Sequence, residues 1–126
     1  MPDAEFEAAE RALGIALPGA WRRHLQKASW LRRGWLSETC YLHLHRPSES
    51  LSRAQARQPF AASHPGILFI GDDGAGEHLA VDLREARPRV MAVPNVSSGW
   101  TDAIEQTASL DDFLAQVDAG SFNFRF

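Results

Sequence analysis

The chain has 126 residues, of which 44% are hydrophobic and 23% are charged, and it contains a single cysteine. This composition is typical of one soluble globular domain and argues against a disordered chain. No apolar run approaches the roughly 18 residues of a membrane span, the acidic N-terminus lacks the pattern of a signal peptide, and Cys40 has no partner for an internal disulfide. We therefore expect a single domain over residues 1–126, located in the cytoplasm without a membrane anchor.

The formal net charge of −3 is unevenly spread along the chain. Residues 11–57 contain nine basic and two acidic residues, whereas residues 58–126 contain four basic and ten acidic residues. Two separate surfaces of opposite charge could steer a charged partner. Alternatively, the two regions face each other in the folded protein, and the sequence alone leaves both arrangements open.

Two short helices are predicted at the start of the chain. The first begins at Asp3, a favoured N-cap residue, and stops at Gly14. The second begins at Pro18, which suits a first helical turn because its missing N–H would be unpaired there. Each helix carries an apolar stripe at helical spacing, made of Phe6, Ala9 and Leu13 in the first and of Trp21, Leu25 and Ala28 in the second.

A period-two pattern over residues 36–45 predicts one strand, and a short polar helix is expected over residues 48–57. Within this strand the pattern Cys40-x-x-His43-x-His45 raises the question of a metal site. Because successive side chains alternate between the faces of a strand, Cys40 points away from both histidines, and the three cannot share one ion. We therefore expect no metal and no cofactor, and we interpret His43 and His45 as polar side chains that face outward.

Residues 66–83, GILFIGDDGAGEHLAVDL, predict a β-hairpin. Glycine reaches the positive-φ conformations of tight turns, and Asp side chains bond their own backbone there. A phosphate loop would run into a helix and end in Lys followed by Ser or Thr, and a calcium loop would carry more regularly spaced acids. The turn is therefore interpreted as structural.

Further strands are expected over residues 89–93 and 103–106, and then a helix over residues 109–117. Ser109 and Asp112 form a pattern like a capping box, and Gly120 ends the helix. The tail alternates Phe122, Phe124 and Phe126 with polar residues. These elements predict an α+β fold, with a mainly antiparallel sheet of four to six strands covered by N-terminal helices and one C-terminal helix. The apolar face of the hairpin, Leu79, Val81 and Leu83, should pack against helical Trp21, Leu25, Phe113 or Leu114.

Catalytic residues are not predicted anywhere in the chain. There is no Gly-x-Ser-x-Gly elbow, and Cys40 lies on the apolar strand face, where a thiol is usually inert.

Basic residues of the segment 22–33 alternate with tryptophans, but the net negative charge is the wrong sign for a dedicated nucleic-acid binder. Binding of a protein partner has more support, because Trp30, Trp35 and Trp100 lie outside the predicted helices and strands and aromatic anchors dominate interface energies.

Three motifs in a fixed order resemble those of the SUKH superfamily: LGIALP at residues 13–18, FIGDDGAG with LAVDL over residues 69–83, and SLDDFL at residues 109–114. That superfamily includes fungal cell-wall-synthesis regulators and bacterial immunity proteins that neutralise polymorphic toxins. The resemblance covers residues 6–117. The segment 28–34 departs from the family's pattern, so nothing that this loop binds can be carried over.

The resemblance implies a non-enzymatic immunity protein that binds a cognate bacterial toxin in the cytoplasm and occludes its active site. The alternative is a non-catalytic regulatory scaffold that binds other cellular proteins. If the toxin is a nuclease, acidic side chains would stand in for the substrate phosphates. We expect partner contacts from Asp72, Asp73 and Glu77 on the hairpin turn and from Trp100 on a loop.

Overall fold

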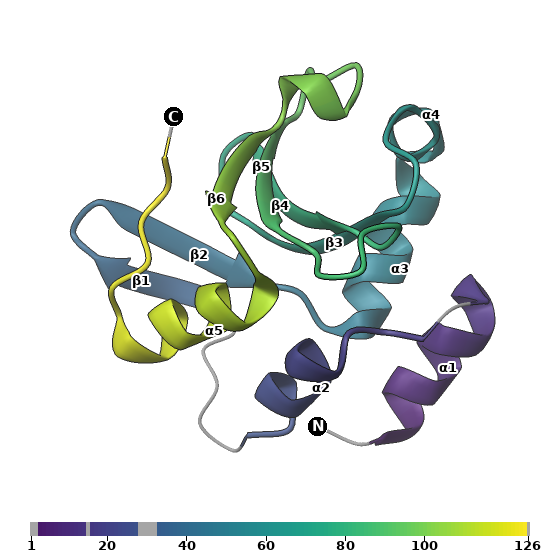
Figure 1. Cartoon of the computed structure of the whole chain (residues 1–126), viewed down its shortest axis with the longest axis horizontal. Helices are drawn as coiled ribbons and strands as arrows, with labels where there is room; N and C mark the ends of the chain where they lie inside the picture. The colour runs from purple at the N-terminus through teal and green to yellow at the C-terminus, as the bar shows by residue number, and fades with distance from the viewer. Residues whose placement is uncertain (1–2, 15, 28–32, 126) are drawn as a thin grey trace.

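Figure 1 shows the computed structural model of the chain, which describes residues 3–14, 16–27 and 33–125. Helices and strands follow in the order α1 (Asp3–Leu13), α2 (Gly19–Leu25), β1 (Arg33–Ser37), β2 (Cys40–Leu44), α3 (Pro47–Ala56), α4 (Gln58–Ser63), β3 (Ile67–Asp72), β4 (Glu77–Asp82), β5 (Val90–Pro94), the 3₁₀ helix η1 (Trp100–Asp102), β6 (Ile104–Thr107) and α5 (Leu110–Ala119). The predicted α+β class is confirmed.

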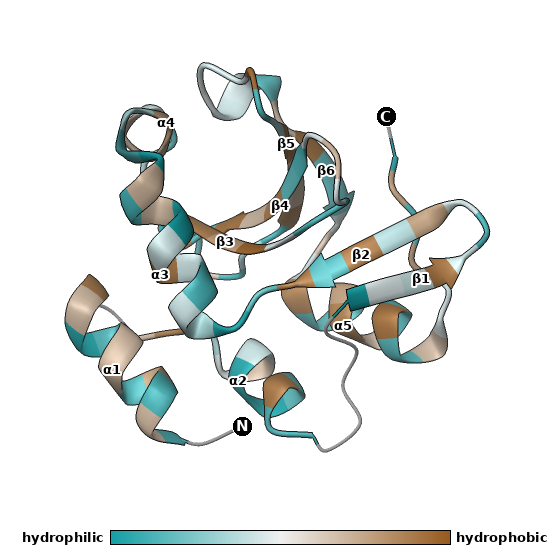
Figure 2. Ribbon diagram, turned by 180° about the vertical axis from the view of Figure 1, so that it is seen from behind, coloured by the Kyte–Doolittle hydropathy of each residue, from teal (hydrophilic) through white to brown (hydrophobic). Residues whose placement is uncertain are grey.

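The six strands form one antiparallel sheet in which each strand pairs with the next along the chain, from β1 at one edge to β6 at the other. Register shifts interrupt the β1–β2, β3–β4 and β5–β6 pairings. Such bulges increase the local twist, and the sheet curls strongly, as Figure 1 shows. Figure 2 shows hydrophobic residues along the central strands β3, β4 and β5. Helical elements therefore have to cover both faces of these strands.

Helices α1, α2 and α5 cover one face of the sheet and bury the main hydrophobic core (Figure 1). Ring pairs link the helices and the tail: Phe6 meets Trp21 edge-on at 6.3 Å, and Phe113 meets Phe122 at 4.8 Å. The predicted packing is confirmed, because this cluster contains Leu79, Val81, Trp21, Leu25, Phe113 and Leu114, with Leu83 packed against it. Such burial of apolar surface is the main source of stability in a small domain.

The opposite face carries a smaller cluster. Phe60 of α4 packs on Phe69 of β3 and on strand residues Ala80, Met91 and Val93. Helix α4 is too short for a 3.6-residue pattern to show in the sequence, and the sequence analysis missed it. None of the described helices is long and apolar enough to cross a membrane.

Local signals placed most helix ends correctly. Gly14 and Gly120 adopt left-handed φ values of 71° and 70°, and the Ser109 hydroxyl accepts a hydrogen bond from the Asp112 amide at 3.1 Å. Pro18 is the N-cap of α2. Asp3 is the first residue of α1, and its carboxylate pairs with Arg22 at 3.0 Å. The predicted stripe residue Ala28 lies outside the described residues.

One strand prediction was wrong. Residues 36–45 form part of a hairpin, in which Ser37 pairs with Cys40 and Trp35 pairs with Tyr41. A two-residue turn alone would reverse the period-two alternation, but the register shift between Trp35 and Ser37 adds one residue to β1 and restores it, so the sequence does not reveal the hairpin. The alternating tail forms no strand over its described residues; instead Phe122 is buried in the core. Phe126 lies outside the described residues.

Ion pairs join regions of opposite charge. Arg22 and Arg46 pair with acids of α1, at 3.0 Å from Asp3 and 2.7 Å from Glu5, and Lys27 pairs with Asp118 at 2.7 Å. The two oppositely charged regions of the sequence are thus partly neutralised against each other and against the acidic start of the chain.

Candidate functional site

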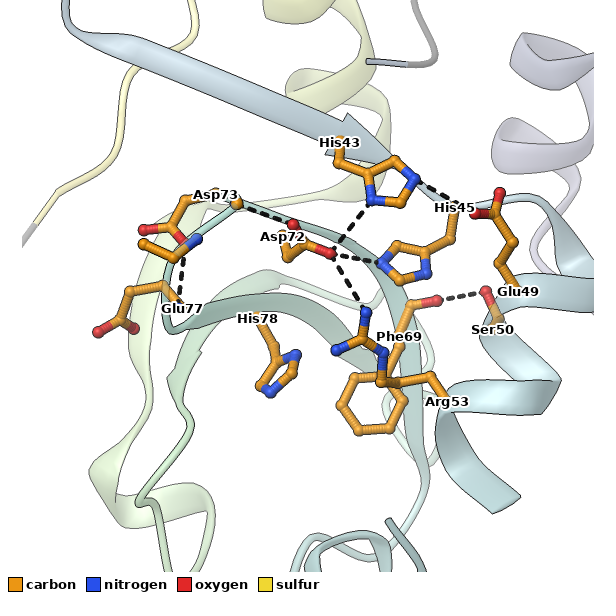
Figure 3. A network of polar contacts seen from close by, with 12 residues as sticks. His43, His45, Glu49, Ser50, Arg53, Phe69, Asp72, Asp73, Glu77 and His78 are labelled. Carbon is orange, nitrogen blue, oxygen red and sulfur yellow. Dashed lines mark hydrogen bonds and ion pairs between the residues drawn. The ribbon is translucent and has the colours of Figure 1, made fainter. Parts of the chain in front are cut away.

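A group of polar side chains is buried where β2 and β3 meet helix α3 (Figure 3). His43 lies in β2 and His45 directly follows that strand, Asp72 comes from β3, and Glu49 and Arg53 come from α3. Strand pairing sets His43 opposite Asp72. Helix α3 begins at Pro47, whose fixed φ and missing N–H suit a first helical turn. The helix packs against β3.

The close approach of β2 and β3 requires a glycine. Gly71 pairs with Leu44, and a Cβ atom at Gly71 would lie 2.5 Å from the carbonyl oxygen of His43. Real side chains essentially never come that near to a backbone atom. Gly71 therefore allows the two strands to bring His43, His45 and Asp72 together.

The Asp72 carboxylate is the centre of this group. Its Oδ2 atom lies 3.1 Å from His45 Nε2, 3.3 Å from His43 Nδ1 and 3.5 Å from Arg53 Nη2. Its other oxygen accepts a hydrogen bond of 2.8 Å from the Gly74 amide. Burial alone would raise the pKa of Asp72, but these hydrogen bonds and the nearby histidines lower it to about 2. Asp72 is therefore ionised at neutral pH, and its side chain is only 14% exposed.

His43 lies between two carboxylates. Its Nδ1 atom faces Asp72, and its Nε2 atom lies 3.2 Å from Glu49 Oε2. Its ring stacks on that of His45 with centroids 4.9 Å apart. The prediction that both histidines face outward was wrong, since His43 is 8% and His45 1% exposed. They do lie on the strand face opposite to Cys40, as predicted, but α3 packs over that face and covers them.

The hairpin turn is structural, as predicted. The Asp73 carboxylate accepts hydrogen bonds from the amides of Ala75, Gly76 and Glu77 at 2.8, 3.1 and 3.1 Å. Gly74 has a φ of 78° and lies against the ring of Tyr41. Both acids of the turn thus hold its backbone, and only Gly74 and Ala75 at the tip are fully exposed among residues 71–77.

A pocket of about 620 Å³ lies between this turn and the β1–β2 hairpin. Its lining includes Arg33, Trp35, Tyr41, His43, Asp73 and Glu77. A second pocket of about 480 Å³ lies on the α3 side and shares His43 and Arg53 with the first. The group of polar side chains around Asp72 therefore borders two solvent-accessible hollows.

Three of the four predicted contact residues come together. Asp72, Asp73 and Glu77 all line the larger pocket, where burial and the neighbouring Asp73 raise the pKa of Glu77. Trp100 lies elsewhere, in η1 near the start of β3, at the opposite end of the β3–β4 hairpin from the turn. Its indole N–H donates to the Pro65 carbonyl at 2.9 Å, and its ring packs edge-on against His64.

Sequence reasoning missed the contribution of α3 and the exposure of Trp35. Glu49 and Arg53 belong to a helix that was predicted only as polar, and nothing local in the sequence indicated which strand it would cover. Trp35, interpreted as a loop residue, lies in β1 and is 67% exposed. Trp30 lies outside the described residues. Cys40 is buried in the core, where desolvation raises the pKa of its thiol, so that it stays protonated.

The fold and the pocket define an α+β domain with a polar site at the end of a curled antiparallel sheet, close to its β1 edge. The chain belongs to the SMI1 / KNR4 family (SUKH-1), whose model matches residues 2–116. No curated protein matches the chain. The resemblance found in the three sequence motifs is thereby confirmed, and family membership is consistent with a non-catalytic binding role.

Proposed function

We propose that this protein is an immunity protein that binds a cognate bacterial toxin and blocks the toxin's active site. The observation that carries the proposal is an exposed aromatic anchor beside a polar pocket. Trp35 is 67% exposed and sits on β1, an edge strand of the six-stranded sheet. Family membership supports a protein partner, since the SUKH families include immunity proteins.

Trp35 has the properties of an interface hot spot. Tryptophan is enriched among the residues that dominate binding energies. The ring of Trp35 packs edge-on against Tyr41 at 5.4 Å, so its orientation is partly fixed before a partner arrives. Fixing a side chain in advance reduces the entropy lost on binding. Among the described residues β1 is also an edge strand of the sheet, and edge strands can pair with a strand of a partner.

Electrostatic recognition would rest on Asp73 and Glu77 rather than on Asp72. The Asp72 carboxylate is already surrounded by His43, His45 and Arg53 and is largely buried. Asp73 and Glu77 line the pocket and are partly exposed. If the toxin acts on an anionic substrate such as a nucleic acid, its active site is positive, and these two acids would compete with the substrate phosphates.

The test requires a candidate toxin domain, which should be sought among the genes that neighbour this one. Co-expression of the wild-type chain should restore growth of cells that express the toxin, and purified chain should inhibit the toxin directly. Trp35→Ala should raise the Kd for the toxin by at least about tenfold, and Glu77→Lys should slow association most strongly at low salt. Ile104→Ala is the matched control, because Ile104 is an exposed apolar residue on β6, the opposite edge of the sheet.

Absence of protection by the wild-type chain would contradict the proposal. Equal binding by the Trp35 and Ile104 variants would exclude the pocket surface as the interface. Tight binding of a defined cellular protein, without inhibition of any toxin, would instead favour the regulatory scaffold.

A further inference from the structure

We propose that His43, His45 and Asp72 form a Zn²⁺ site. The proposal rests on the buried group around Asp72 in Figure 3 and is independent of the immunity function. It replaces the expectation of no metal, which considered Cys40 with the two histidines and did not include a donor from another strand. Cys40 remains excluded, because it lies in the core on the other face of β2.

Two of the three donor separations match those of a tetrahedral zinc site. Zinc binds His nitrogen and carboxylate oxygen at about 2.0–2.2 Å, which places neighbouring tetrahedral donors roughly 3.3 Å apart. Here Asp72 Oδ2 lies 3.3 Å from His43 Nδ1 and 3.1 Å from His45 Nε2. Donor atoms of all three residues lie within 4.8 Å of one another. Imidazole nitrogen with carboxylate oxygen is a donor set that suits zinc.

His43 lies between two carboxylates, with Nδ1 toward Asp72 and Nε2 toward Glu49. A neutral imidazole carries one N–H group, so it can donate to Glu49 or to Asp72 but not to both. If Nε2 carries the proton toward Glu49, the Nδ1 lone pair faces the Asp72 oxygen and the two repel each other. A zinc ion bound to Nδ1 and to Asp72 removes this repulsion. Glu49 then accepts the hydrogen bond from the other ring nitrogen of His43 and orients the ring, as outer-shell carboxylates do in many zinc sites.

The proposed ligands are largely buried and lie on or beside paired strands. His45 is 1% exposed, and its Nδ1 atom has no hydrogen-bond partner among the described residues. His43 lies in β2, His45 directly follows it, and Asp72 lies in the adjacent strand β3, which Gly71 allows to approach closely. Ligands on paired strands hold their geometry better than ligands on loops.

Arg53 is compatible with a bound ion. Its guanidinium lies 3.5 Å from the Asp72 carboxylate, and about a third of its side chain is exposed, so it can turn toward solvent when zinc occupies the site. The Glu49 carboxylate stays beside His43 and helps to balance the positive charge of the ion. The two pockets that border His43 give a fourth ligand, water or a side chain of a partner, access to the ion.

The test is zinc binding by the full chain, purified without a histidine tag. After incubation with ZnCl₂ and extensive dialysis, elemental analysis should find one Zn²⁺ per chain, and zinc should raise the melting temperature. The variants His45→Gln and Asp72→Asn should lose the ion and the thermal shift. Glu49→Gln should bind zinc about 10–100-fold more weakly, as expected for an outer-shell partner.

His78→Gln is the matched control. His78 lies opposite Asp72 in the β3–β4 pairing and lines the same pocket, but its Nε2 atom is bonded to Asn95 Oδ1 at 2.7 Å. This variant should keep its zinc. If a ligand variant fails to fold, Co²⁺ titration of the wild type serves instead, since a four-coordinate site gives intense visible absorption that differs from that of six-coordinate Co²⁺. No binding by the wild type, a six-coordinate Co²⁺ spectrum, or equal binding by all variants would overturn the proposal.

Discussion

The two faces of the sheet are built from different kinds of side chain. The face under α1, α2 and α5 is apolar throughout its centre and carries the larger core cluster. The face under α3, α4 and η1 has a small apolar cluster, and beside it lie the buried histidines His43, His45, His64 and His78. Burial of apolar area is non-directional, whereas buried polar groups need defined partners. The first face therefore stabilises the fold, and the second positions chemical groups.

The largest expected effect is on the apolar face. Phe113→Ala removes a fully buried ring that contacts Phe122, and should lower the free energy of unfolding by about 3–5 kcal/mol. Phe60→Ala, on the other face, should lower it less, because the cluster there is smaller. Urea denaturation measures both. Equal losses would show that the two faces contribute alike to stability.

The second prediction concerns the close approach of β2 and β3. Gly71→Ala places a methyl group against the His43 carbonyl and should destabilise the fold by about 1–3 kcal/mol through overpacking. Gly76→Ala is the matched control, since nothing lies within 4 Å of its added Cβ. Thermal unfolding of the two variants is the measurement. A Gly71 variant as stable as the Gly76 variant would mean that the strands separate there at little cost.

A smaller effect is expected at the start of α5, which covers the apolar face. Ser109→Ala removes the N-cap bond to the Asp112 amide and should lower stability by about 1 kcal/mol. The control is Ser121→Ala, beyond the other end of α5, where the hydroxyl is exposed and makes only a 3.4 Å contact with Gln116. Chemical denaturation should give a lower free energy of unfolding for the Ser109 variant than for the Ser121 variant. Indistinguishable curves would show that the Ser109 cap does not stabilise α5.

The last prediction is a dependence of stability on pH. Burial lowers the pKa of His24 in α2, although Asp118 of α5 raises it, and Lys27 lowers it further. The unfolded chain therefore binds a proton at His24 more readily than the folded chain does. The contribution of neutral His24 to folding stability is fully present above the usual pKa of 6.5 and declines as the pH falls below it. His24→Gln should flatten the plot of unfolding free energy against pH on the acidic side of 6.5. Burial also lowers the pKa of His78, so the His24→Gln variant should keep part of the dependence of stability on pH.

Much of the fold could be predicted because its signals are local. The Asp-Gly turn, the Ser109 cap and the stop at Gly120 each act within a few residues, and the structure uses all three. Apolar periodicity identified the strands β3, β4 and β5 and the buried stripes of α1 and α2. The same reasoning failed at residues 36–45, since the bulge in β1 offsets the change of face that a two-residue turn produces, and the alternation then resembles that of a continuous strand.

The site depended on tertiary structure. Alternation along β2 determined that His43 and His45 share a face opposite Cys40. Only the packing of α3 decided that this face is buried, and only the pairing of β3 brought Asp72 to them. These groups are far apart in the sequence, and their approach depends on strand register and on Gly71. Local propensity and periodicity act over a few residues, so the sequence determined the elements and the faces of the strands, while the long-range packing of α3, β2 and β3 decided which polar residues meet.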